Sequence, residues 1–275
     1  MSKLALAGQT VMITGASGGI GRCLATVFRR SNCHLVLLGT NEDRLNAVVR
    51  DLPQGDGKVF SYVCDLRNRA NIEEVIVKTV DECPSVDILV NNAGYALGAT
   101  APFWEQDLVN VESVMDVNLR GLMAITHYVL KLHMTKRSPH ACGTVVNVSS
   151  ITGHQAPLKE FFETSYHTAK AAVEGFTNVL RHETLGTNIR VLVNRPGTVQ
   201  TEFHSRRLGY DQDKTAAMFE GMGALLPEDI AASVLWQCMQ PERVSVVTME
   251  TLPTAQRSLY AADRSWEERN GPVRR

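Results

Sequence analysis

The sequence places a tyrosine and a lysine four residues apart, at Tyr166 and Lys170, in a stretch with helical periodicity. Residues at positions i and i+4 project from the same face of a helix. A free phenol has a pKa of about 10, so acid/base work near neutral pH needs a fall of roughly two to three units. A neighbouring ammonium group favours the phenolate by its charge. The pair therefore indicates proton transfer, although an exposed Tyr–Lys pair on an ordinary helix has the same spacing.

A hydroxyl group precedes this pair in the chain. The apolar segment Thr144–Val148 is typical of a strand and ends in Ser149-Ser150. At the edge of the crevice that holds Tyr166, the Ser150 hydroxyl can hydrogen-bond the reacting oxygen atom. Ser149 is expected to be a backbone neighbour.

A glycine-rich turn, Thr14-Gly15-Ala16-Ser17-Gly18-Gly19-Ile20-Gly21, joins an apolar segment to an amphipathic one. Glycine permits a tight turn, a close approach of backbone to pyrophosphate, and close packing of helix on sheet. The start of the following helix offers free N–H groups and a positive dipole end to phosphates. Glycines also serve ordinary turns, so this motif alone does not decide the function.

Two further turns follow strand-like segments. Asn91-Asn92-Ala93-Gly94 comes directly after Ile88–Val90, and its small residues leave room for a ligand, although a plain Asn-Gly turn has the same sequence. Asp65 follows another apolar segment and either accepts from an adenine amino group or caps the next helix. Taken alone, Asp65 is better explained as a cap.

The elements that must position these residues follow from periodicity, because short apolar segments alternate with longer amphipathic ones. The expected strands are Thr10–Thr14, His34–Leu38, Lys58–Val63, Ile88–Val90, Thr144–Val148, Arg190–Asn194 and Val244–Thr248. The expected helices are Ile20–Arg30, Asp43–Leu52, Ile72–Glu82, Val111–Lys136 and Ser165–Glu183. This pattern predicts an α/β fold, a doubly wound Rossmann-type parallel sheet of about seven strands flanked by helices.

Length and composition favour a globular protein with one domain over residues 1–275, from which Thr201–Leu226 departs as an excursion that covers the ligand. A net charge of -1 gives no basic field for nucleic acid. The six cysteines lack metal-site or dithiol spacing, so no metal is expected. A secretory leader and a membrane-spanning run are not recognisable, so we expect a cytoplasmic location without membrane partners.

The motifs TGxxxGIG, NNAG, VSS and YxxxK, with an asparagine in the helix between the second and third, occur in the order found in the short-chain dehydrogenase/reductase superfamily. The sequence resembles that superfamily over nearly the whole chain. The resemblance implies that Tyr166 is the acid/base and that Lys170 binds the nicotinamide ribose. It further implies that Ser150 orients the substrate oxygen and that Asn118 anchors a proton-relay water.

The resemblance also implies the residues that contact the dinucleotide. They include the segment Arg195–Thr201, whose backbone near Val199 and hydroxyl at Thr201 hold the nicotinamide amide and a neighbouring phosphate. The full expected set is Gly15, Ser17, Gly19, Ile20, Gly21, Thr40, Asn41, Asp65, Asn92, Ala93, Gly94, Tyr166, Lys170, Pro196, Gly197, Val199 and Thr201.

The preferred cofactor is NADP. NAD-preferring relatives carry an acidic residue at the end of the second strand, where this chain has Gly39-Thr40-Asn41. Without that carboxylate, a 2′-phosphate meets no repulsion. The arginines usual in NADP enzymes are also missing there, so Thr40 and Asn41, with Arg22 or Arg44, are the expected hydrogen-bonding partners.

The C-terminal segment Glu250–Gln256 and the segment Leu226–Ala231 resemble the branch of NADP-dependent 3-hydroxy acid and serine or allo-threonine dehydrogenases. A 3-hydroxy acid needs a cation for its carboxylate. The candidates near the expected mouth, each better explained as a solvated charge, are His154, Lys159, Arg206 and Arg207.

One departure from the family concerns the interval before Tyr166. Ser150 lies sixteen residues before it, against about thirteen in the family, so His154–Thr164 should form a longer loop at the substrate mouth. The alternatives are the same chemistry on a bulky apolar substrate such as a steroid or retinoid, against which the polar loop argues weakly, and a non-catalytic dinucleotide-sensing protein. By resemblance, Val111–Lys136 and Ser165–Glu183 would pack in a homodimer or homotetramer.

Overall fold

The structure is a computed structural model that describes residues 6–97, 101–157 and 159–273. The strands of these residues are β1 (Thr10–Thr14), β2 (His34–Gly39), β3 (Val59–Val63), β4 (Ile88–Asn91), β5 (Cys142–Val148), β6 (Asn188–Pro196) and β7 (Thr248–Thr251). Their α-helices are α1 (Gly19–Arg30), α2 (Glu42–Asp51), α3 (Arg69–Glu82), α4 (Leu108–Met115), α5 (Leu122–Leu132), α6 (Thr164–Glu183), α7 (Glu202–Arg207), α8 (Gln212–Phe219), α9 (Pro227–Cys238) and α10 (Trp266–Asn270).

The described strands form one parallel sheet in the order β3-β2-β1-β4-β5-β6-β7, which confirms the predicted doubly wound fold. The chain proceeds from β1 to β2 and β3 on one side and resumes with β4 on the other side of β1. Parallel strands end at the same edge of a sheet, and a ligand crevice forms where the strand order reverses. The turns after β1 and β4 are therefore brought together at that edge.

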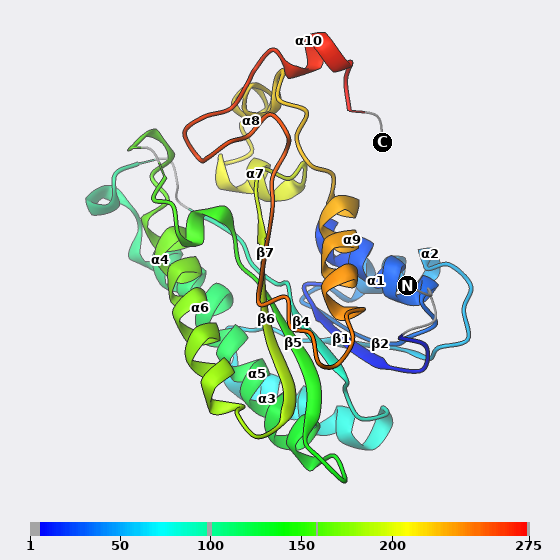
Figure 1. The fold of residues 1–275 in the computed structure, drawn as a ribbon. Coiled ribbons are helices and arrows are strands. Elements are labelled where there is room, and N and C mark those ends of the chain that lie inside the picture. Colours follow the sequence, from blue (N-terminus) through cyan, green and yellow to red (C-terminus); the bar gives the residue numbers. More distant parts are fainter. Residues whose placement is uncertain (1–5, 98–100, 158, 274–275) are drawn as a thin grey trace.

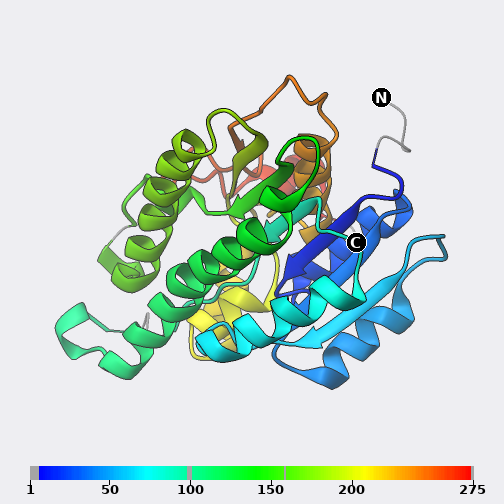
Figure 2. The same cartoon turned by 90° about the horizontal axis from the view of Figure 1, so that it is seen from below.

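Two helical layers cover the sheet (Figures 1 and 2). Helices α1, α2 and α9 pack on one face, where Leu24, Phe28 and Val234 belong to a buried cluster. Helices α3, α5 and α6 pack on the other face with buried residues such as Ile76 and Val129. Because both faces are covered, the central strands are continuous apolar runs and do not alternate with polar residues.

The last strand differs from the prediction. It comprises Thr248–Thr251 and not Val244–Thr248, because pairing with β6 begins at Val193 and Thr248. The carbonyl oxygen of Val244 instead accepts a hydrogen bond from the Arg190 guanidinium at 3.2 Å. A side chain therefore takes the acceptor that a strand ladder would use.

The predicted helix Val111–Lys136 is divided. Helix α4 ends at Met115, a π-helical segment covers Asp116–Gly121, and α5 begins at Leu122. The π-helical turn contains Asn118, whose side chain donates to the carbonyl oxygen of Val114 at 2.8 Å. Such turns occur often at functional sites, and here it carries a candidate site residue.

A buried chain of polar side chains ties the central strands to both neighbouring helices. Asn91 donates to Thr126 on α5 at 2.8 Å and to Asn147 on β5 at 2.9 Å. Asn147 donates in turn to Thr177 on α6 at 2.8 Å. These bonds fix the ends of β4 and β5 relative to α6, from which the candidate site is built.

The six cysteines are free thiols. Cys33, Cys64 and Cys238 are buried beside β2, β3 and α9. Burial raises the pKa of each of these three thiols to about 12. They are therefore protonated at neutral pH and behave as small apolar groups. No helix in the described part of the chain is long and apolar enough to cross a bilayer.

Candidate active site

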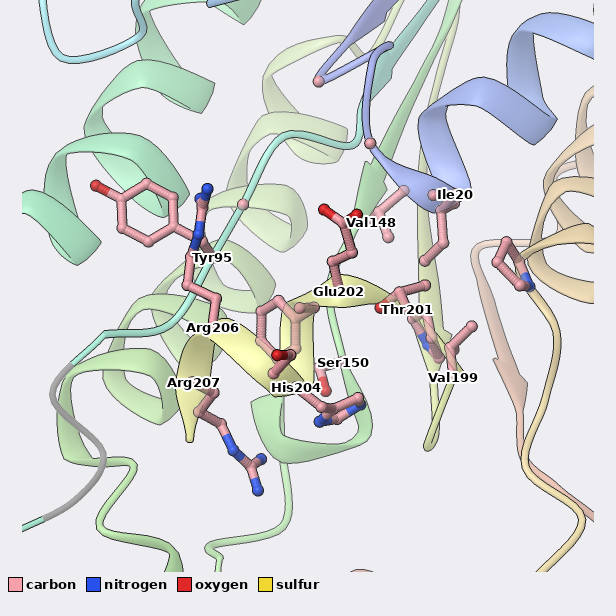
Figure 3. A pocket seen from close by; sticks show the side chains of 18 of the residues that line it. Ile20, Tyr95, Val148, Ser150, Val199, Thr201, Glu202, His204, Arg206 and Arg207 are labelled. Atoms are coloured by element: carbon pink, nitrogen blue, oxygen red, sulfur yellow. The ribbon is translucent and has the colours of Figure 1, made fainter. Parts of the chain in front are cut away.

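A cleft of about 2640 Å³ opens at the carboxyl ends of the strands. Its walls come from the turns after β1, β4, β5 and β6, the start of α6, and α7 (Figure 3). The structure brings most predicted site residues to this cleft, namely Gly15, Ser17, Gly19, Ile20, Gly21, Thr40, Asp65, Asn92, Ala93, Gly94, Ser150, Tyr166, Lys170, Pro196, Gly197, Val199 and Thr201.

The turns after β1 and β4 are interlocked. The Thr14 hydroxyl accepts hydrogen bonds from the backbone N–H groups of Asn92 and Ala93, both at 3.0 Å. The Asn92 side chain donates to the carbonyl oxygen of Thr14 at 3.0 Å. Gly15 has a φ of 64°, and a Cβ there would lie 2.8 Å from the Cα of Ala93. Only glycine fits this approach without moving the second turn.

The start of α1 suits a phosphate. A Cβ at Gly21 would lie 2.1 Å from the carbonyl oxygen of Gly15, so the helix can begin this close to the turn only with glycine. Its N-cap, Gly18, offers no side-chain acceptor, and the first turn holds no acidic residue. The N–H groups and positive dipole end at Gly19–Gly21 are therefore available to the cleft, which is the arrangement that a dinucleotide pyrophosphate requires.

Tyr166 and Lys170 lie one turn apart in α6. The Lys170 ammonium is buried, donates to the carbonyl oxygen of Val148 at 2.8 Å, and lies 5.7 Å from the centroid of the Tyr166 ring. The Ser150 side chain lies within hydrogen-bonding reach of the Tyr166 phenol. The end of β5 and the first turns of α6 thus place phenol, hydroxyl and ammonium groups at one corner of the cleft.

The predicted fall in the pKa of Tyr166 is not found. Burial raises the pKa of its phenol above the ordinary value and the Glu163 carboxylate adds to the increase, whereas Ser150 and Arg207 oppose it. Burial also lowers the pKa of Lys170 to about 8, against the opposing charge of Glu174. The sequence argument counted the charge of Lys170 but not the burial of both groups.

Asn118 lies behind the cleft and does not line it. Its side-chain amide donates to the carbonyl oxygens of Tyr95 and Val114, both at 2.8 Å, and its Oδ1 has no partner in the described part of the chain. A Cβ at Gly94 would lie 2.5 Å from that oxygen. Asn118 therefore fixes the backbone that follows the second turn, including Tyr95.

Two expected cofactor contacts have partners within the protein. Asn41 caps α2, accepts from the backbone N–H of Arg44 at 2.9 Å, and does not line the cleft. The interpretation of Asp65 as a helix cap is wrong, because Asn68 caps α3. Asp65 lines the cleft and pairs with Arg67 at 2.7 Å.

The segment after β6 is held by the C-terminal part of the chain. The Gln256 side chain accepts from the backbone N–H of Thr198 at 2.9 Å, and Gly197 donates to the carbonyl oxygen of Thr251 at 2.8 Å. A Cβ at Gly197 would lie 2.6 Å from the side-chain oxygen of Gln256. The segment Glu250–Gln256, singled out only by resemblance, therefore shapes the wall of the cleft.

The long interval between Ser150 and Tyr166 borders the cleft through Phe161 and Glu163. Gln155 accepts from the backbone N–H of Leu259 at 3.0 Å, and residue 158 lies outside the described residues. The C-terminal segment therefore also anchors this loop.

Three side chains of helix α7 contact other residues of the cleft. The Phe203 ring centroid lies 5.1 Å from that of Tyr166. The Arg206 guanidinium lies 5.6 Å from the centroid of the Tyr95 ring. Arg207 forms an ion pair with Glu163, which precedes Tyr166 by three residues.

Arg207 is not the solvated charge that the sequence suggested. The side chains of Arg207 and Glu163 are only 6% and 4% exposed. Burial raises the pKa of Glu163 and the Arg207 guanidinium works against that increase. Lys159 and Arg206 are exposed as expected, whereas His154 lies 3.3 Å from a carboxylate oxygen of Glu250.

Sequence analysis missed Tyr95, Glu163 and Phe203. The available signal was position, because Tyr95 directly follows the NNAG turn, Glu163 lies one helical turn before Tyr166, and Phe203 lies two residues after Thr201. Which of these side chains face the cleft depends on how α7 packs, and no local pattern encodes that.

The strand reversal, the glycine turn beside it and the buried Tyr–Lys pair define a dinucleotide-binding oxidoreductase of Rossmann type. The sequence profile described as short chain dehydrogenase matches residues 9–209. The chain belongs to this family, whose members are NAD(P)-dependent enzymes.

Curated relatives and a solved structure cover most of the chain. It is 35% identical to sulfoacetaldehyde reductase 2 of Chromohalobacter salexigens over 92% of this chain and 98% of the relative. It is 33% identical to the NADP-dependent 3-hydroxy acid dehydrogenase of Salmonella typhi over 90% and 95%. The closed form of a serine dehydrogenase complexed with NADP+ superposes with a TM-score of 0.83 at 32% identity, covering 90% of this chain and 96% of that one.

The substitution Glu163→Gln tests the buried ion pair. It leaves the Arg207 charge buried without a counter-charge, so the free energy of unfolding should fall by about 3–5 kcal/mol. Urea unfolding of both proteins at neutral pH measures the difference. The control, Glu82→Gln, removes the charge that pairs with the exposed Lys78 and keeps a side-chain oxygen that can accept from Tyr62, so it should change stability by less than about 1 kcal/mol. Equal effects of the two substitutions would contradict the role given to Glu163.

Proposed function

We propose that this enzyme transfers a hydride between NADP(H) and a small alcohol or carbonyl substrate, with Tyr166 as its acid/base. The observation that carries the proposal is the corner of the cleft that Tyr166, Ser150 and Lys170 share. It lies in the same cleft as a glycine turn suited to a pyrophosphate. We further propose that residues 1–275 act as a single domain and that residues 201–226 cover the substrate.

The proposed chemistry assigns one task to each side chain. A bound nicotinamide supplies or accepts the hydride. Ser150 and Tyr166 hold the substrate oxygen between their hydroxyl groups, and Tyr166 gives a proton to that oxygen in reduction or takes one in oxidation. Lys170 would hold the ribose of a bound nicotinamide dinucleotide, and Asn118 would support a relay water. Because burial raises the pKa of Tyr166, the protonated phenol predominates at neutral pH and supports reduction.

The substrate class that we propose is a 3-hydroxy acid, such as serine or allo-threonine, or the corresponding carbonyl acid. The names of the relatives support this, since serine, 3-hydroxy acids and sulfoacetaldehyde all carry an acidic group. A bulky steroid- or retinoid-like substrate is less compatible with the charged side chains of Glu202 and Arg206 in the cleft. A non-catalytic sensing protein would not need the complete set of Asn118, Ser150, Tyr166 and Lys170.

The variant Tyr166→Phe tests the mechanism. It removes the proton-transferring hydroxyl and keeps the ring that packs on Phe203, so turnover should fall at least about a thousandfold while NADPH still binds. Nicotinamide absorbance measures turnover, and quenching of protein fluorescence measures binding. Undiminished turnover would refute Tyr166 as the acid/base.

We propose NADP as the preferred cofactor, supported by the exposed Thr40 after β2 and by Arg44 at the cleft, whereas Arg22 already pairs with Asp51. Wild type should favour NADP at least about tenfold in kcat/KM. Thr40→Asp should reverse much of that preference, because a carboxylate repels the 2′-phosphate and accepts from the ribose hydroxyls. Thr40→Ala is the matched control. A tenfold preference of the wild type for NAD would overturn the proposal.

We also propose a cytoplasmic homodimer or homotetramer. Exposed apolar side chains on the helices expected to pair support the assembly, since Met123 and Val179 are 41% and 58% exposed. An interface would remove them from water. Sedimentation equilibrium should give two or four times the mass of the chain, and Val179→Lys should lower it. A monomeric wild type would exclude the assembly.

A further inference from the structure

Helix α7 carries two consecutive arginines that have different surroundings. Figure 3 shows the Arg206 side chain beside Tyr95, whereas the Arg207 side chain extends away from it on the other side of the helix. Both residues line the cleft. An acidic substrate needs a cation there, and the surroundings decide which of the two is available.

Arg207 is already neutralised. It is buried against Phe161, with its guanidinium 5.3 Å from that ring, and is paired with the buried Glu163. A substrate carboxylate that took Arg207 would have to displace Glu163. That displacement would leave a carboxylate buried without a partner, which is strongly unfavourable.

The other basic side chains around this part of the cleft either bond to groups of the protein or are uncharged. Lys170 donates to the carbonyl oxygen of Val148 beside Tyr166. Arg264 holds the last carbonyls of α8, with a bond of 2.8 Å to that of Met218. His204 is uncharged at neutral pH, because burial lowers its pKa to about 3. Toward the other end of the cleft, Arg67 is paired with Asp65.

Arg206 is exposed, and no salt bridge joins it to a carboxylate of the described residues. Unlike Arg264, whose guanidinium is bonded to backbone carbonyl oxygens, Arg206 has only an aromatic ring as the partner of its guanidinium among the described residues. Its guanidinium stacks on Tyr95, whose carbonyl oxygen accepts from Asn118. Phe203, three residues earlier in the same short helix, contacts the Tyr166 ring. Positions i, i+3 and i+4 share a helix face, so both arginines lie with Phe203 on the side of α7 that covers the acid/base. Their partners distinguish them, because Arg207 is paired with Glu163 and Arg206 lies over Tyr95.

We propose that Arg206 binds the acidic group of the substrate at the mouth of the cleft, with Tyr95 orienting its guanidinium, and that Arg207 takes no part in this recognition. The assignment rests on the proposed function, because it presumes an acidic substrate. A guanidinium can form two parallel hydrogen bonds to a carboxylate or a sulfonate. Since Arg206 is exposed, salt screens its attraction, whereas a buried arginine would be much less sensitive to salt.

The test compares an acid with its uncharged analogue in wild type and Arg206→Met. With 3-hydroxypropionate, the variant should raise KM about five- to tenfold and leave kcat within about twofold. With methyl 3-hydroxypropionate, and for NADP, KM should not change. Raising the salt from 0.05 to 0.5 M, a span of about tenfold in ionic strength, should raise the wild-type KM for the acid only.

Two further variants separate the effect of the Arg206 charge from the effects of its geometry and of surface charge in general. Arg206→Lys keeps the charge without the paired geometry, so it should retain the salt dependence with an intermediate KM. Lys78→Met removes one exposed positive charge from α3, outside the cleft, where Lys78 lies 3.6 Å from Glu82, and should leave the ratio of KM for acid and ester unchanged.

The outcomes separate this inference from the proposed function. If wild type turns over the acid and Arg206→Met leaves the ratio for acid and ester unchanged, or raises KM for NADP instead, the role of Arg206 is overturned and the substrate class stands. If wild type turns over the ester but not the acid, both assignments of an acidic substrate fail while hydride transfer stands. If wild type reduces only uncharged ketones or steroids, the substrate class itself is wrong.

Discussion

The hydrogen bonds from the backbone of Asn92 and Ala93 to the Thr14 hydroxyl join the turn after β1 to the turn after β4. Parallel strands bring these turns to one edge, but only this bonding, together with the missing side chain at Gly15, lets them touch. The contact forms the floor of the cleft. It also sets the position of Gly94 and therefore of Asn118 and Tyr95 behind it. The nucleotide end and the reacting end of the site thus share one rigid support.

Buried hydrogen bonds hold the reacting groups in place on that support. Lys170 is bonded to the end of β5, and the chain of amides and hydroxyls from Asn91 through Asn147 to Thr177 holds β5 against α6. A group fixed in this way loses little conformational freedom when a substrate binds. The same burial moves the pKa values of Tyr166 and Lys170 away from those of exposed side chains.

Local patterns in the sequence predicted the parallel sheet, and the resemblance to a known family supplied most of the residues that meet in the cleft. Apolar runs define strands, and glycines mark turns where a side chain cannot fit. Prediction failed where the position or burial of a residue depends on packing between segments that are distant in the chain. Arg207 resembles a surface charge in the sequence, but α7 packs so that Arg207 is buried with Glu163. The helix around Asn118 resembles a regular one in the sequence, but the Asn118 side chain also donates to the backbone of Tyr95, 23 residues earlier. The last strand was misplaced for a similar reason, since Arg190 occupies a carbonyl of the expected ladder.

The buried thiols beside β2, β3 and α9 can report when this part of the protein unfolds locally. Cys33 precedes β2, Cys64 follows β3 and Cys238 ends α9, and their raised pKa values leave almost no thiolate at neutral pH. Cys64 borders the cleft, whereas Cys33 and Cys238 do not, so an alkylating reagent or peroxide can reach Cys33 and Cys238 only when that region opens. The rate at which these two buried thiols are labelled therefore reports the rate of local unfolding. A bound dinucleotide should slow that labelling, and no engineered probe is needed to measure it.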